Sequence, residues 1–127
     1  MISTAEMIVG KITNITSVSI DVTTDVEGSR DQIRQAIKSV NHGSGVVIFT
    51  DMFGGTPSNI SLSFLDDTHV EVITGVNLAM LLQFSTSNTE ASFQETVRLL
   101  RQGGQENIRI ASEFLKQRAK SKKSGGI

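Results

Sequence analysis

The sequence contains no cysteine, which excludes disulfide bonds, thiolate metal ligands and a cysteine nucleophile. It also lacks an excess of either charge, since 12 lysines and arginines against 13 aspartates and glutamates leave a formal net charge of −1. We therefore expect no broad basic field that would hold nucleic acid or an anionic membrane. No apolar run approaches the roughly 20 residues that cross a bilayer, and no secretory signal pattern opens the chain. At 127 residues of ordinary globular composition, we expect one soluble, cytoplasmic domain.

Strand and helix patterns alternate along the chain. Strand patterns fall at residues 18–22, 46–49 and 70–73. Helical patterns fall at 2–9, at 29–40 behind a capping box of Ser29 and Gln32, after Thr56, at 78–84, and from 93 onward with Gly103–Gly104 as an interruption. The uninterrupted apolar run at 46–49 is typical of a strand that is covered on both faces. This order predicts an α/β fold, a parallel sheet with helices on both faces.

The end of the chain is basic and finishes in Ser-Gly-Gly-Ile. We interpret residues 118–127 as a flexible, solvated tail, which leaves a domain of residues 1–117. Contact of this tail with a partner is the alternative.

Two loops follow strands at the edge where ligands bind in parallel sheets, namely residues 51–57 and 75–77. Gly54 and Gly55 permit a turn with positive φ and the close approach of a ligand to the backbone. Thr56 is a good N-cap, and the single proline, Pro57, suits the first helical position. A helix that begins there directs free N–H groups at the crevice, which favours a phosphoryl group, although such a turn is often only structural.

The string Asp51–Asn59, DMFGGTPSN, is much more specific than its parts. It resembles the IIA component of the mannose/fructose/sorbose family of the bacterial phosphoenolpyruvate-dependent sugar phosphotransferase system. Ala5–Gly10 is similar to the end of that family's first helix, and Ile73–Leu81 is similar to its second active-edge loop. The resemblance covers the chain from about residue 5 to residue 116.

This resemblance implies a phosphoryl carrier. Such a component accepts a phosphoryl group on a histidine from the histidine phosphocarrier protein and passes it to a IIB component. The family fold is a homodimer in which the neighbour contributes an edge strand, and it associates indirectly with a membrane sugar permease. Neither a cofactor nor a metal is implied. Asp51 would orient the histidine ring, and the phosphate-binding residues would be Gly54, Gly55, Thr56, Ser58 and Asn77.

The sequence departs from the family pattern at its start. The first strand and the Thr-His-Gly turn with the nucleophile are not found, and His42 and His69 are predicted at the amino ends of strands, away from Asp51. We expect a start that is recorded too late or a truncated gene. A non-catalytic binding or regulatory paralogue that keeps the phosphate crevice and the partner surface is the alternative, and an unrelated flavodoxin-like phosphate binder is a third.

An incomplete sheet also bears on assembly. Without a strand beside residues 46–49, unpaired backbone groups would be left at an apolar edge, which predicts an oligomer of low stability or aggregation. The alternative is direct pairing of residues 18–22 with 46–49.

Overall fold

The computed structural model describes residues 1–20, 25–52, 56–87 and 90–124, with the backbone alone at 56–58 and 123–124. Two strands and six helices lie in this part of the chain. In order they are α1 (Ile2–Val9), α2 (Val26–Val40), β1 (Val46–Thr50), α3 (Thr56–Leu62), β2 (Val70–Thr74), α4 (Leu78–Thr86), α5 (Phe93–Glu106) and α6 (Ala111–Ser124).

The two strands form a parallel sheet. Val46 pairs with Val70, and the register continues to Thr50 opposite Thr74. The N–H of Val46 donates to the carbonyl of His69 at 2.8 Å, which extends the ladder at its start. The strands expected at residues 46–49 and 70–73 are confirmed, and so is the predicted α/β class with a parallel sheet.

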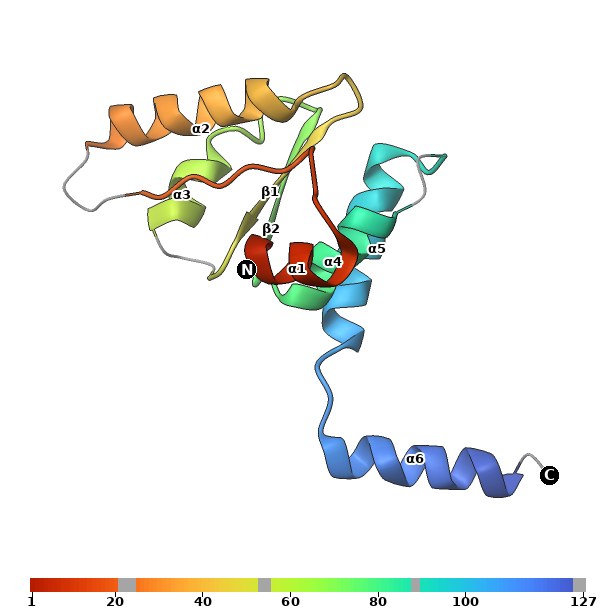
Figure 1. Cartoon of the computed structure of the whole chain (residues 1–127). Coiled ribbons are helices and arrows are strands. Elements are labelled where there is room, and N and C mark those ends of the chain that lie inside the picture. The colour runs from red at the N-terminus through yellow and green to blue at the C-terminus, as the bar shows by residue number, and fades with distance from the viewer. Residues whose placement is uncertain (21–24, 53–55, 88–89, 125–127) are drawn as a thin grey trace.

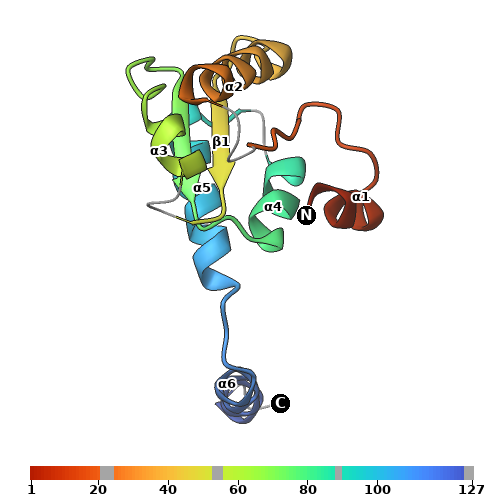
Figure 2. The same ribbon diagram turned by 90° about the vertical axis from the view of Figure 1, so that its left-hand side faces the viewer.

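Helices lie on both sides of this sheet (Figures 1 and 2). α3 packs on one side, where it contacts both strands and α2. α4 and α5 pack against each other on the other side, α5 contacts β2, and α1 packs on α4. This layering is what the apolar strands require, because each face of the sheet presents side chains that must be covered.

A hydrophobic core cluster of the described residues lies between the sheet and the α4–α5 pair. Ile73, Met80 and Leu100 are buried there, with Leu100 only 1% exposed. Phe49 joins the cluster and meets Phe84 edge to face, with ring centroids 6.1 Å apart. This geometry is one that aromatic pairs prefer.

The start of α2 corrects one expectation. The helix begins at Val26, and the side chain of Asp25 accepts a hydrogen bond from the N–H of Gly28 at 2.9 Å. Ser29 lies inside the helix and is 1% exposed, so the capping box predicted at this serine is wrong. Asp25 caps the helix earlier, because a carboxylate oxygen serves the free N–H groups at least as well as a hydroxyl.

The glycine pair in α5 corrects a second expectation. The helix continues through Gly103 and Gly104 to Glu106 instead of being interrupted there. A Cβ atom on Gly104 would lie 2.6 Å from Cε of Met80 on α4, so the end of the Met80 side chain packs where a larger residue at position 104 would stand. The glycines lower helix propensity, but close packing against α4 compensates for it.

The strand expected at residues 18–22 is not found where the structure describes it. Residues 18–20 lie outside any strand, and residues 21 and 22 lie outside the described residues. Residues 18–20 therefore do not pair with β1, whose described sheet partner is β2. Residues 14–18 and Ile20 instead line a cavity together with all five residues of β1.

The C-terminal part projects from the body as α6 (Figures 1 and 2). Helix α6 runs to Ser124, so the domain boundary predicted after residue 117 falls inside it. Phe114 is flanked by two guanidinium groups, those of Arg109 and Arg118, at 4.6 and 5.9 Å from its ring centroid. Among the described residues, no helix combines the length and the apolar character needed to traverse a lipid bilayer.

Candidate functional site at the carboxyl edge of the sheet

The loops after β1 and β2 leave the sheet at the same edge, because the two strands are parallel. The N–H of Val76 donates to the carbonyl of Thr50 at 3.0 Å and thereby joins the two loops. Gly75 has φ +81°, a left-handed conformation in which a Cβ would be strained. The structure thus holds the second loop close to the point where Asp51 begins the first.

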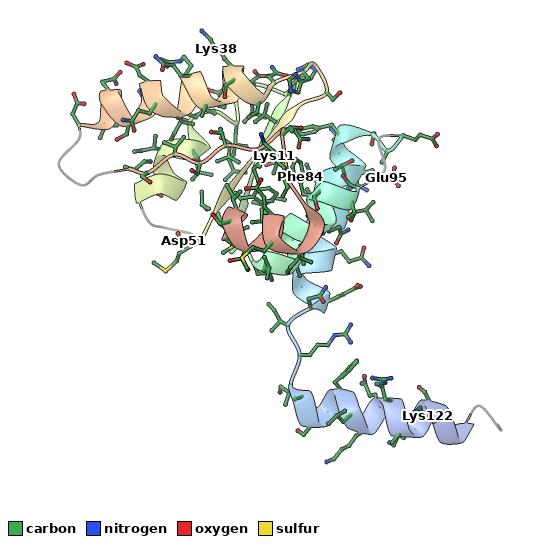
Figure 3. The ribbon with its side chains drawn as sticks, viewed as in Figure 1. Lys11, Lys38, Asp51, Phe84, Glu95 and Lys122 are labelled. Carbon is green, nitrogen blue, oxygen red and sulfur yellow. The ribbon has the colours of Figure 1, made fainter. Side chains whose placement is uncertain are left out.

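Asp51 lies directly after β1 and is exposed. Figure 3 shows its side chain beyond the end of the strand. Its carboxylate has no hydrogen-bond or ion-pair partner within residues 1–20, 25–52, 56–87 and 90–124. The group is therefore accessible to a donor that comes from elsewhere, which is what the orientation of an imidazole requires.

The helix expected after Thr56 is present as α3, but it begins at Thr56 itself, one residue earlier than expected, so that Pro57 is its second residue and not its first. Gly54 and Gly55 lie outside the described residues, as do the side chains of Thr56 and Ser58. The phosphate-binding role of these four residues therefore stays a prediction.

Asn77 is occupied within the fold. Its Oδ1 accepts from the N–H of Met80 at 3.0 Å and caps α4, and its Nδ2 donates to the carbonyl of Gly104 at 2.9 Å. These two bonds tie the loop after β2 to both α4 and α5. They account for an asparagine at this position without a ligand, and its role in binding phosphate stays a prediction.

Both histidines lie at the opposite end of the sheet, where the two strands begin. His69 immediately precedes β2 and His42 precedes β1, and both are exposed. Nδ1 of His69 lies 3.6 Å from Oδ1 of Asp67 and 3.4 Å from Oγ1 of Thr68, so its neighbours are residues of its own turn. A five-residue strand spans roughly 16 Å, which keeps this imidazole away from Asp51.

Sequence reasoning missed the bond from Asn77 to Gly104. The available signal was the glycine pair itself, since glycine in a helix often marks a close approach of another element. No cluster of three or more histidine and acidic side chains that could hold a metal ion occurs in the part of the chain that the structure describes.

These features define a parallel α/β domain whose candidate site lies at the carboxyl edge of the sheet. A family model described as "PTS system fructose IIA component", where PTS is the phosphotransferase system, matches residues 1–100. The chain therefore belongs to this family of IIA components, which have a phosphotransfer role in sugar phosphotransferase systems.

Two relatives give the extent of the similarity. The chain is 27% identical over 112 residues to the PTS system fructose-specific EIIA component of Bacillus subtilis, covering 87% of this chain and 77% of that protein. It is 29% identical over 111 residues to the PTS system mannose-specific EIIAB component of Escherichia coli K12, covering 86% of this chain. The chain spans only 34% of that longer protein.

Solved structures share the fold. The EIIA component from Streptococcus agalactiae superposes with a TM-score of 0.76 at 23% identity, over 87% of this chain and 86% of that one. The PTS IIA protein associated with the fucose utilization operon of Streptococcus pneumoniae gives 0.74 at 24% identity, over 89% and 84%. The predicted mannose-type IIA fold is thereby confirmed.

Proposed function

We propose that this chain works between the histidine phosphocarrier protein and a IIB component, both of which dock at the carboxyl edge of its sheet. The same family membership supports indirect association with a membrane sugar permease. As the resemblance implies, Gly54, Gly55, Thr56 and Ser58 would lie where the phosphoryl group of this family passes, and Asp51 would orient a histidine ring that neither His42 nor His69 supplies.

The observation that carries the proposal is the exposed Asp51 carboxylate at an edge that neither histidine reaches. A carboxylate bonded to one ring nitrogen leaves the other free as the nucleophile and supports the imidazolium character of phosphohistidine. Because His42 and His69 lie at the other edge, these 127 residues by themselves bind the two partners without accepting the phosphoryl group.

The test combines labelling with binding. The purified chain is mixed with phosphocarrier protein that carries a radioactive phosphoryl group, and acid-labile label on the chain is counted. We expect none, whereas stoichiometric label that a His42→Gln or His69→Gln change removes would contradict the proposal. In parallel, amide shifts of the chain on addition of the phosphocarrier should cluster near Asp51 and Gly75. If no such shifts occur at millimolar phosphocarrier protein, the proposed docking at the carboxyl edge is wrong.

We also propose a homodimer. Ile108 and Ile110 are 76% and 63% exposed and lie in a non-helical segment between α5 and α6. Ile108 also lines a groove beside β2, together with Val72 and Thr74. An apolar-basic-apolar segment next to a strand edge favours the strand exchange that the resemblance implies.

Light scattering tests the assembly. The chain should have the mass of a dimer at micromolar concentration, and the double change Ile108→Lys with Ile110→Lys should give a folded monomer. A monomeric unmodified chain would contradict the homodimer and leave the phosphocarrier binding experiment unaffected.

A further inference from the structure

Basic and acidic side chains are distributed unevenly along the chain. Across Ala111–Ser124, the range of α6, five lysines and arginines against one glutamate leave a formal net charge of +4. All other residues together have seven lysines and arginines against twelve aspartates and glutamates, a net charge of −5. The chain as a whole thus lacks a broad basic field, but α6 is a basic helix attached to an acidic domain.

Helix α6 stands apart from the acidic body. A non-helical segment joins it to α5, and both ribbon views show the helix beyond this segment, away from the sheet (Figures 1 and 2). Figure 3 shows Lys122 near the end of α6, roughly 16 Å along the helix from its first residue, Ala111. Charges interact over only about 8 Å at physiological ionic strength, so the acidic charge of the body is largely screened at this end of the helix.

One side of α6 combines positive charge with apolar surface. The side chains of Lys116 and Lys122 are exposed and have no hydrogen-bond or ion-pair partner among the other described residues. Leu115 is 62% exposed, and Phe114 lies one residue before it. With 3.6 residues per turn, these two apolar side chains share one side of the helix, about 100° wide, with the cations Arg118 and Lys122. A surface that touches this side therefore meets both kinds of group.

We propose that α6 binds the surface of a membrane that contains anionic phospholipids. The headgroups of such lipids attract the lysine and arginine side chains, whose aliphatic parts let Phe114 and Leu115 enter the edge of the acyl layer from the same side. The helix lies along the surface, because its five cations do not fit the acyl interior. This interaction surface is separate from the carboxyl-edge site and from residues 108–110, so it depends on neither the phosphocarrier docking nor the homodimer.

An acidic protein partner fits α6 less well. The carboxylates of such a partner would neutralise the cations, but Phe114 and Leu115 would also need an apolar pocket at a matching position. An anionic bilayer offers charge and apolar contact at every point of its surface, so it requires no matched arrangement of groups. The acidic body of a second copy has the same disadvantage as any other folded acidic partner.

The first test is flotation of the full chain with lipid vesicles. Two compositions are compared, phosphatidylcholine alone and the same lipid with about one third phosphatidylglycerol. We expect at least about tenfold more chain on the anionic vesicles, because only these attract the cations of α6. A rise in salt to about 0.5 M should release the chain, since screening shortens the range of the attraction. Equal binding to both compositions, binding that salt does not weaken, or no binding at about millimolar anionic lipid would overturn the proposal.

Charge-reversal variants assign the binding to α6. The double change Lys116→Glu with Lys122→Glu is compared with Lys11→Glu with Lys38→Glu, in which both lysines are exposed and lie outside α6 (Figure 3). Both variants change the net charge of the chain equally. The first should weaken binding to anionic vesicles at least about tenfold, and the second should change it by less than about twofold, since only the first alters the basic helix. Equal weakening would mean that the overall charge governs binding and would overturn the proposal.

An apolar variant distinguishes a bilayer from an acidic protein. Leu115→Ala should weaken binding to anionic vesicles by about threefold, because less apolar surface leaves water. Ile8→Ala on α1 is the matched control, since Ile8 is 60% exposed and its side chain has the same size, and it should leave binding unchanged. If Leu115→Ala binds like the unmodified chain, or if a soluble oligoglutamate peptide binds the chain more tightly than the vesicles do, α6 serves an acidic protein and the proposal is wrong.

Discussion

The two sides of β1 differ in how completely other residues pack against the strand. Toward β2, the strand is paired along its length and Ile73, Met80 and Leu100 are each less than one tenth exposed. On the outer side, the same strand borders a cavity of about 540 Å³ and residues that make no ladder with it. One strand can thus border a well-packed cluster and an open cavity. We expect the cluster to contribute most to the free energy of unfolding and the cavity to tolerate changes in side-chain volume.

The largest effect should follow from Leu100→Ala. Leu100 is 1% exposed within the filled cluster, so the change leaves a cavity and should lower the free energy of unfolding by about 2–5 kcal/mol. Leu99→Ala is the matched control, since this neighbour on the same helix is 43% exposed and its loss should be well under half as large. Urea unfolding measures both. Equal losses would mean that the α4–α5 cluster is not the stable region.

The next effect concerns the residue that links three elements on the filled side. Asn77→Ala removes the cap of α4 and leaves the carbonyl of Gly104 without its donor, so we expect a loss of about 2 kcal/mol. Asn77→Ser keeps a capping oxygen and should lose about half as much because only the second bond disappears.

A control for this pair lies in α5. Asn107 donates to the carbonyl of Gly103 at 2.7 Å, but the bond is exposed, so Asn107→Ala should cost less than about 0.5 kcal/mol. If Asn107→Ala and Asn77→Ala cost the same, burial of the Asn77 bonds contributes nothing. The packed side of β1 would then not be the more stable of its two sides.

The elements of the filled side were largely predictable from local sequence. The apolar run at Val46–Thr50 and the alternation at Val70–Thr74 are strong patterns, and Asn77 is a good cap for the apolar helix that follows it. These local patterns could not show contacts between residues that lie far apart in the sequence. The acceptor of Asn77 Nδ2 lies 27 residues away, and Gly104 acts as a contact only once α4 is in place.

The outer side was predicted less well, for a related reason. Val18 and Ile20 have a strand pattern, but a strand forms only when a neighbour lies within hydrogen-bond reach, and here these two residues line a cavity together with β1. Asp25 and Ser29 are both good caps, so local sequence does not choose between them. At the site, the position of Asp51 at the carboxyl end of β1 followed from strand order, whereas its exposure did not, and the roles of Gly54 and Gly55 remain predictions.

A smaller effect, of opposite sign, should come from filling the cavity beside β1. Ala36→Leu adds aliphatic volume where the helix faces the cavity and should raise the free energy of unfolding by about 0.5–1 kcal/mol. Gln35→Leu, at an exposed neighbour, should change it by less than about 0.5 kcal/mol. Urea unfolding distinguishes them. A clear loss of stability in Ala36→Leu alone would mean that the cavity beside β1 is already filled in solution.

The smallest effect should follow from removing residues 118–127. Described residues 118–122 are exposed, and the ring of Phe114 in α6 lies near the guanidinium groups of Arg109 and Arg118. Truncation removes helical turns without exposing the filled cluster, so far-ultraviolet circular dichroism should lose helix signal while the urea midpoint stays unchanged. Phe114→Ala in the full chain is the control and should also leave the midpoint in place. A lower midpoint in the truncated chain would show that α6 packs on the domain, and residues 1–117 would then not be the folding unit.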